Sequence, residues 1–255
     1  MKKFFRYKIK SKALATVLML AIPVAALMLM ESYTHVPWDL TPPIFILNLV
    51  GYYLIYLLGT FLFGGVSGGY TFVTLLFMCC GLANYCVVCF RSSPIVPWDI
   101  YSIRTAVSVA DNYNIDITGK LIGVVLGFLV LTVLGRVLPG KVKKLRIRLA
   151  GLALSICCVF GYVKAVGSDA VIETVGLDTT LFTPNVLYRN NGLLAGFAGN
   201  IRFMKVEKPE GYSTKAAEEV AQSYQTQETT TAKKDLPNII VIMNEAFSDL
   251  SVFGD

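Results

Sequence analysis

Long apolar stretches, separated by short polar segments, dominate the first two-thirds of the chain. A helix needs about 20 mostly apolar residues to cross the hydrocarbon of a bilayer. Five stretches meet this length, and we predict transmembrane helices at 13–30, 44–63, 70–90, 121–138 and 149–166. Their only charged residues are Arg136 and Lys164, near the ends of the fourth and fifth, and the second holds one amide, Asn48. The pattern predicts an α-helical polytopic membrane domain over residues 1–166.

Composition and charge support this prediction. The chain is 55% hydrophobic and 16% charged, whereas soluble domains carry about 25% charged residues. Its net charge of +6 comes from two basic clusters that contain no acid and flank apolar stretches, one at residues 2–12 and one at 136–148. Such clusters mark cytoplasmic loops. They predict a plasma-membrane protein with a cytoplasmic N-terminus and an extracytoplasmic C-terminal segment, and they offer no basic face to a nucleic acid.

The first apolar stretch, at 13–30, has two interpretations. Its basic N-terminal flank is also typical of a cleaved signal peptide. The stretch is longer than the roughly 7–15 apolar residues of a signal peptide, and further spans follow it. We therefore favour an uncleaved transmembrane helix.

Cysteine and histidine give little indication of chemistry. All six cysteines fall in predicted spans, and Cys86 and Cys89 form a CxxC pair. No nearby cation lowers a thiol pKa there, so we interpret the pair as small apolar side chains buried in a helix. His35 is the only histidine, and we expect a surface residue, because no second metal ligand lies close to it in the sequence.

The predicted extracytoplasmic loops share a short repeat, VPWD, at 36–39 and 96–99. Tryptophan favours the membrane–water boundary, so both copies are expected to be interfacial anchors with turns that begin at proline. The second copy opens the loop 91–119, whose apolar spacing predicts a helix on the membrane surface. Its charged residues Asp99, Arg104 and Asp111 are candidates to contact a lipid head group, with a solvated polar face as the alternative.

After the last span, the chain changes character. Residues 167–235 are expected to form an extracytoplasmic linker with helical parts, including one helix capped by Ser213 or Thr214. The continuous β-branched run 238–243 is typical of a strand buried on both faces of a parallel sheet. Glu245 follows it, at the strand end where α/β sheets bind ligands. A carboxylate there is a hard oxygen ligand for Mg²⁺ or Mn²⁺.

The motif PNIIVIMNEAFSDL at 237–250 resembles the start of the sulfatase-like domain in the lipoteichoic acid synthase family. These proteins are membrane phosphoglycerol transferases of the alkaline phosphatase superfamily. The five-span layout, the outer loop PWDIYSIRTAVSVADNY and the run KVEKPEGYS are similar to the family as well, so the resemblance covers essentially the whole chain. It implies that residues 236–255 begin a truncated α/β catalytic domain.

The resemblance also implies a reaction and a metal. Members move glycerol phosphate from phosphatidylglycerol to a cell-envelope polymer or another acceptor through a threonine nucleophile. The resemblance implies that Glu245 binds Mn²⁺ or Mg²⁺. The catalytic residues cannot be assigned, because the family's nucleophile follows this strand, whereas Thr229, Thr230 and Thr231 precede it. We expect the 255-residue chain, as a fragment, to be inactive alone.

Two other functions remain open. One alternative is a phosphoethanolamine transferase or a sulfatase-like hydrolase of the same superfamily, which residues that bind the head group would separate. A different class is a non-catalytic five-helix protein that binds lipid or scaffolds partners through the loop 91–119. Ion-coupled transport is disfavoured, because no predicted span has an acid or base near its middle.

Overall fold

The computed structural model describes residues 8–102, 116–205 and 211–223. The chain divides into two compact units, Met1–Val206 and Glu207–Asp255. The strand expected at 238–243, Glu245 and residues 103–115 of the loop 91–119 lie outside the described residues. In the second unit, helix α10 (Thr214–Ser223) begins where Ser213 Oγ accepts a hydrogen bond from the Ala216 N–H at 3.0 Å, as its capping residues predict.

Within the described residues, five helices are long and apolar enough to cross a membrane. They are α1 (Lys12–Glu31), α2 (Pro42–Leu62), α3 (Val66–Arg91), α5 (Gly119–Val137) and α6 (Leu145–Val166). Each coincides with a predicted span to within a few residues, so the prediction of five apolar helices is confirmed. This architecture is compatible with a multi-pass membrane protein.

Local sequence explains where the long helices begin and end. Ser11 Oγ accepts from the Leu14 N–H at 3.3 Å at the start of α1, and Thr118 Oγ1 accepts from the Leu121 N–H at 3.1 Å at the start of α5. These side chains satisfy amide groups that have no partner inside the helix. At the other end of α2, the Arg148 guanidinium donates to the carbonyls of Phe61, at 2.9 Å, and Leu62.

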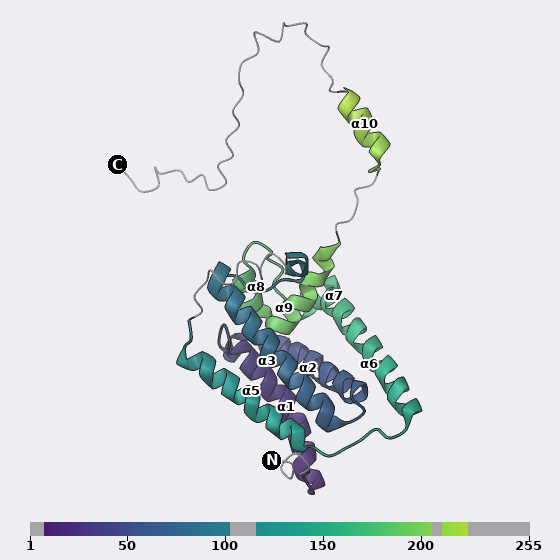
Figure 1. The fold of residues 1–255 in the computed structure, drawn as a ribbon. Coiled ribbons are helices and arrows are strands. Elements are labelled where there is room, and N and C mark those ends of the chain that lie inside the picture. The colour runs from purple at the N-terminus through teal and green to yellow at the C-terminus, as the bar shows by residue number, and fades with distance from the viewer. Residues whose placement is uncertain (1–7, 103–115, 206–210, 224–255) are drawn as a thin grey trace, which may run out of the picture. The chain divides into compact units, whose positions relative to one another are not determined.

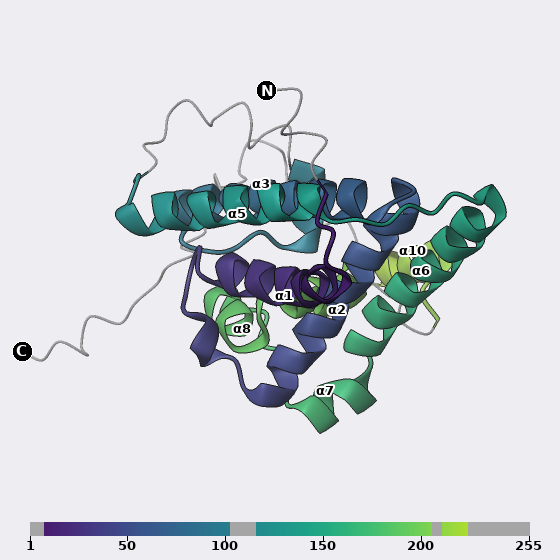
Figure 2. The ribbon, with the colours of Figure 1, turned by 90° about the horizontal axis from the view of Figure 1, so that it is seen from below.

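The five helices pack with α3 beside α5 and α2, α1 beside α5 and α2, and α6 beside α2 (Figures 1 and 2). Helices α2 and α3 approach closely because glycines face each other. A Cβ atom at Gly69 would lie 2.4 Å from the backbone nitrogen of Thr60. Small residues at such contacts let membrane helices pack backbone to backbone.

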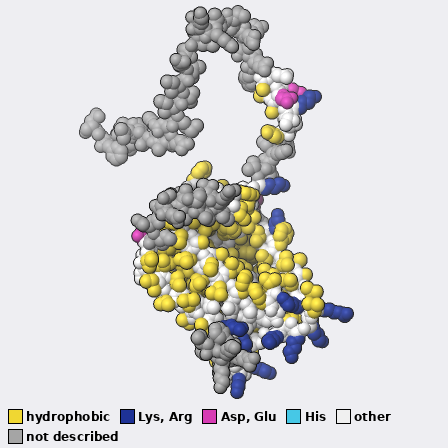
Figure 3. Space-filling view, viewed as in Figure 1, with side chains coloured by type: hydrophobic (Ala, Val, Ile, Leu, Met, Phe, Trp, Pro, Cys, Tyr) yellow, Lys and Arg dark blue, Asp and Glu magenta, His cyan; other side chains and the backbone are white. Residues whose placement is uncertain are grey.

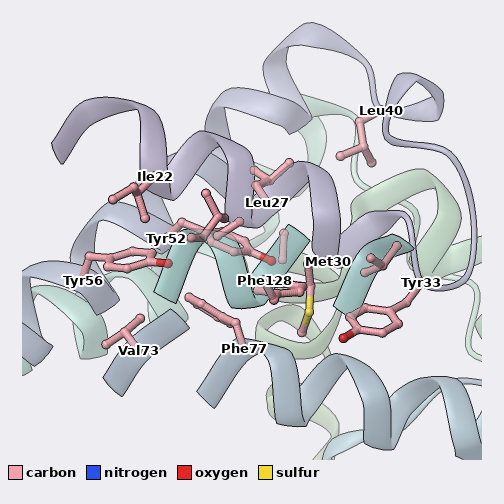
Figure 4. Packing of buried hydrophobic residues seen from close by; sticks show 14 of the residues in the cluster. Ile22, Leu27, Met30, Tyr33, Leu40, Tyr52, Tyr56, Val73, Phe77 and Phe128 are labelled. Carbon is pink, nitrogen blue, oxygen red and sulfur yellow. The ribbon is translucent and has the colours of Figure 1, made fainter. Parts of the chain in front are cut away.

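Aromatic rings fill the space between α1, α2, α3 and α5 (Figure 4). The ring centroids of Tyr52 and Phe77 lie 4.5 Å apart, and those of Tyr33 and Phe128 lie 5.9 Å apart. Tyr56 is fully buried, and its hydroxyl forms a 2.9 Å hydrogen bond with Thr74 Oγ1. Stacked rings of this kind contribute about 0.5–1.5 kcal/mol beyond their buried area.

The chain after α6 folds back onto the spans as α7 (Asp169–Val175), α8 (Pro184–Asn191), α9 (Leu193–Asn200) and η5 (Ile201–Met204). Helix α9 packs against both α2 and α6. The sequence predicted a membrane domain over 1–166 and a linker with helical parts over 167–235. The compact unit Met1–Val206 includes these short helices, because α9 packs against the long helices.

This unit has two chemically different ends. Lys8, Arg136 and Lys141 lie together at one end, and in Figure 3 Lys and Arg side chains gather at one end of the unit while hydrophobic side chains cover the middle. The opposite end carries α7, α8 and the short turns at 37–39 and 97–102 (Figure 1). We call them the basic end and the α8 end.

Candidate functional site at the α8 end

Asn48, the one amide of the second predicted span, fixes the α8–α9 hairpin to the long helices. Its Nδ2 donates to the Asn191 carbonyl at 2.7 Å and to the Ile44 carbonyl at 2.9 Å, and its Oδ1 accepts from the Ala195 N–H at 2.9 Å. Between α8 and α9, Gly192 has φ +76°, and a Cβ there would lie 2.8 Å from Asn48 Nδ2. One buried side chain thus joins the last turn of α8 and the first turn of α9.

Glu31 holds the same hairpin from α1. Its side chain is fully buried, and Oε1 accepts from the Leu193 N–H at 3.0 Å at the start of α9. An anion is stabilised there by the positive end of the helix dipole. Oε2 lies 2.7 Å from His35 Nε2, and the His35 side chain is only 10% exposed. The expectation of a surface histidine is therefore wrong, because His35 lies one helical turn after a buried carboxylate and pairs with it.

Both VPWD copies form short 3₁₀ turns that begin at proline, as predicted, and each aspartate binds an arginine. Asp99 accepts from both terminal nitrogens of Arg91, and Asp39 Oδ2 accepts from Arg189 Nε at 2.8 Å. Burial alone would raise the pKa of Asp99, but the hydrogen bonds from Arg91 and the Val96 N–H lower it below its usual value. Asp99, a candidate for head-group contact, is partly exposed and pairs with Arg91 of the same chain.

A pocket of about 530 Å³ opens between the first of these turns, the end of α3 and α8. Its wall comes from the segment after α1, the end of α3, the start of α5 and α8, and comprises Thr34, His35, Val36, Asp39, Val88, Ser92, Pro94, Lys120, Asn185, Tyr188 and Arg189. Lys120 Nζ donates one hydrogen bond, to the His35 carbonyl at 3.1 Å. An ammonium has three donors and a guanidinium five, so Lys120 and Arg189 keep donors for another acceptor.

Neutral polar groups complete this α8-end pocket. Asn185 Nδ2 donates to the Ser92 carbonyl, which leaves its amide oxygen as an acceptor. Burial raises the pKa of the Tyr188 hydroxyl, so Tyr188 stays protonated at neutral pH. Thr34 Oγ1 lies 3.1 Å from His35 Nδ1. The wall therefore combines two cations, one carboxylate and several hydroxyl or amide groups, a set suited to a ligand with one anionic group and neutral hydroxyls.

An apolar cavity of about 340 Å³ lies between α2, α3 and α9. Met30, Tyr52 and Phe77 belong to its wall, and all three appear in Figure 4. The apolar cavity includes Asn84 and the polar pocket includes Val88, one turn further along α3. Two buried atoms in the wall of the apolar cavity, Tyr52 Oη and Asn84 Nδ2, have no hydrogen-bond partner within the described part of the chain. The cavity thus combines an apolar surface with donors for an acceptor group.

The described residues contain no group of three or more His, Cys, Asp and Glu side chains that could hold a metal ion. Glu245, the metal ligand implied by the resemblance, lies outside them. Cys86 and Cys89 are free, and Cys89 is exposed on the surface of α3 rather than buried. Helices that face hydrocarbon carry apolar side chains on their outer surface, so a small apolar side chain such as Cys89 can lie there rather than in the core.

The sequence did not indicate Lys120, Arg189 or Asn185, because each is an isolated polar residue outside any motif. Two sequence features could have indicated ion pairs of the site: the i, i+4 spacing of Glu31 and His35, and the aspartate repeated in each VPWD. Comparisons with models of protein families, with curated proteins and with solved structures find no match to this chain.

Proposed function

We propose that the chain is the membrane part of a phosphoglycerol transferase, and that the α8-end pocket binds the head group of phosphatidylglycerol. The observation that carries the proposal is the pocket itself, where Lys120 and Arg189 lie beside Asp39 and Asn185. In this proposal, the α8 end faces the extracytoplasmic side of the plasma membrane. An acceptor from the cell envelope reaches the site from that side.

The charge distribution supports this orientation. Among the described residues, Lys8, Arg136 and Lys141 of the two basic clusters line one cavity at the basic end, whereas α8 lines a different pocket at the other end. Loops rich in Lys and Arg stay in the cytoplasm. With five spans, a cytoplasmic N-terminus leaves the chain after α6 on the extracytoplasmic side.

The α8-end pocket matches the head group in charge and in hydrogen bonding. A phosphodiester carries one negative charge, and Lys120 and Arg189 against Asp39 leave one net positive charge in the wall. Arginine and lysine are the usual protein partners of phosphate oxygens. The two hydroxyls of the terminal glycerol suit Asp39 as an acceptor and Asn185 as an amide partner. Phosphatidylethanolamine, the alternative head group, has an amine and no hydroxyl at this position.

The apolar cavity supports a lipid ligand rather than a soluble one. Its wall of α2, α3 and α9 residues is adjacent to the pocket along α3. Tyr52 Oη and Asn84 Nδ2 supply donors that suit the ester carbonyl of an acyl chain. A polar group buried without a partner costs about 1–3 kcal/mol, so a lipid ester would relieve that cost.

The reaction belongs to the domain that residues 236–255 resemble. A Mn²⁺ or Mg²⁺ ion bound through Glu245 would stabilise negative charge on phosphoryl oxygens. Lys120 and Arg189 orient the head group at the membrane surface, and the apolar cavity holds the lipid in place. The described residues thus bind and position the donor.

Native mass spectrometry of the detergent-released chain tests the proposal. We expect retention of phosphatidylglycerol in preference to phosphatidylcholine and phosphatidylethanolamine. The double variant Lys120→Gln/Arg189→Gln should weaken this retention about tenfold or more, because each lost charge-assisted hydrogen bond contributes about 1.5–3 kcal/mol. The matched control Lys164→Gln/Arg202→Gln removes two cations that lie outside the pocket wall. Equal loss in both variants, or no head-group preference, would contradict the proposal.

A second candidate is a lipid-binding membrane protein without catalysis. The observation in its favour is that every residue of the pocket wall precedes Val206 and belongs to one compact unit. Phosphatidylglycerol-dependent release of diacylglycerol separates the two when the chain is assayed together with a sulfatase-like domain that supplies the threonine nucleophile, because the chain alone is expected to be inactive. Release that requires the chain supports the transferase, whereas head-group binding without release under these conditions supports the lipid-binding protein.

A further inference from the structure

A second polar cavity, of about 660 Å³, lies at the basic end. Three cations from separate segments belong to its wall: Lys8 before α1, Arg136 in the last turn of α5 and Lys141 in the loop that follows α5. The remaining wall comes from the α2–α3 turn and the α5–α6 loop: Phe63, Gly64, Gly65, Ser67, Gly68, Leu138, Pro139 and Gly140. Cations distant in sequence therefore converge on one space.

Ser67 connects two of these cations. Lys8 Nζ donates to Ser67 Oγ and to the Arg136 carbonyl, both at 2.6 Å. Ser67 Oγ donates to the same carbonyl at 2.7 Å, and a terminal nitrogen of Arg136 lies 3.3 Å from Ser67 Oγ. The ammonium and the guanidinium thus meet at one hydroxyl group.

Among the described residues, the wall of this cavity contains no Asp or Glu that could balance these charges. The sequence explains this, because residues 1–30, 40–98 and 117–168, which supply the helices and loops of the basic end, contain no acid at all. Burial, together with the nearby charges of Arg136 and Lys141, lowers the pKa of Lys8. Like charges packed this closely repel one another unless an anion from outside the chain joins them.

The backbone around the basic-end cavity is fixed and favours an anion. The Val66 N–H donates to the Gly140 carbonyl at 3.1 Å, and the Val142 N–H donates to the Gly64 carbonyl at 3.0 Å. These bonds hold the two loops against each other at the N-terminus of α3. The N-terminus of a helix carries a partial positive charge and free N–H groups, which bind phosphate in many proteins.

We infer that the basic-end cavity binds a phosphate group, carried by the head group of an anionic phospholipid in the adjacent leaflet or by a free phosphate anion. The site is separate from the α8-end pocket and does not depend on the proposed transferase function. The phosphate neutralises the repulsion among Lys8, Arg136 and Lys141 and ties the segment before α1 to the loops after α2 and α5.

The test compares two variants that remove equal charge from the same end of the protein. Lys8→Gln/Lys141→Gln changes the cavity wall, whereas Lys143→Gln/Lys144→Gln changes two exposed residues of the neighbouring loop that do not belong to it. One arm measures retention of phosphatidic acid and phosphatidylglycerol by native mass spectrometry. The other measures inorganic phosphate binding by calorimetry. We expect the cavity variant to bind phosphate about a hundredfold more weakly, or about tenfold for each lysine.

Each outcome decides the inference. If only the cavity variant loses lipid retention, the site binds a phospholipid. If only the cavity variant loses inorganic phosphate binding, the site binds the free anion, and loss in both arms means that it accepts a phosphate group from either source. Unchanged binding in both arms, or equal loss in the control, overturns it. If the double variant fails to fold, Lys141→Gln alone serves, since this side chain is exposed. Both basic-end variants are compared in the Lys120→Gln/Arg189→Gln background, which removes the α8-end contribution to lipid retention, so the two sites are scored separately.

Discussion

Replacing Asn48 with alanine should release the α8–α9 hairpin without unfolding the long helices. The variant leaves two backbone groups without their partner, the Asn191 carbonyl and the Ala195 N–H. Each orphaned buried group costs about 1–3 kcal/mol. Hydrogen bonds between membrane helices often contribute less, about 0.6 kcal/mol on average. Asn48 bonds instead to helix termini with no intrahelical alternative, so we expect a loss of about 2–4 kcal/mol for the two groups together.

Hydrogen exchange with mass spectrometry measures this loss directly. A loss of about 2–4 kcal/mol corresponds to roughly thirty- to several-hundredfold faster exchange, because each 1.4 kcal/mol is about a factor of ten. The effect should be confined to peptides that cover 184–205, which include α8 and α9. The control is Ser155→Ala, whose buried hydroxyl bonds only to the Leu152 carbonyl of its own helix, at 3.0 Å. Equal exchange in 184–205 for both variants would refute the role of Asn48.

Two further predictions address the turns and the helix contacts. Asp99→Asn should destabilise the turn at 97–102 by about 1 kcal/mol, since the ion pair with Arg91 is partly exposed. Because its folded pKa is lowered, this carboxylate stabilises the protein above the ordinary aspartate pKa of about 4 and loses that contribution as the pH falls through the lower folded value. Thermal unfolding between neutral and acidic pH should therefore depend less on pH in the variant, and an unchanged pH dependence would argue against the pair. Gly69→Ala should cost about 1–3 kcal/mol, because its Cβ would lie 2.4 Å from Thr60 N. Gly123→Ala, where a Cβ meets nothing within 4 Å, should be neutral or stabilising in the same unfolding assay, and similar losses in both glycine variants would exclude a specific α2–α3 contact.

The long helices were predictable because a helix that crosses the hydrocarbon needs about 20 mostly apolar residues in a row. Their ends were predicted to within a few residues from the limits of the apolar stretches, and in the structure Ser11 and Thr118 cap the starts of α1 and α5. The turn at each VPWD followed from proline, as predicted. These features depend on residues that are close together in the sequence.

The candidate site was not predictable in the same way. Asn48 bonds to Asn191 across 143 positions, and no local pattern in the α8 sequence PNVLYRNN indicates that it packs on the spans. Arg189 becomes part of a pocket only because Asp39, 150 positions away, accepts its hydrogen bond. His35 is the intermediate case, since Glu31 is one turn before it and the spacing alone permits the pair.

We propose above that the α8-end pocket faces the extracytoplasmic side and holds a phosphatidylglycerol head group. The most direct measurement introduces Asn185→Cys, in the pocket wall, into a chain whose six native cysteines are replaced by alanine. A membrane-impermeant maleimide is then added to intact cells and, with purified protein, in the presence of short-chain phosphatidylglycerol or phosphatidylcholine. We expect the introduced thiol to be labelled from outside the cell, and its labelling to be slowed by phosphatidylglycerol and not by phosphatidylcholine. Labelling only after the membrane is opened, or equal rates with both lipids, would contradict it.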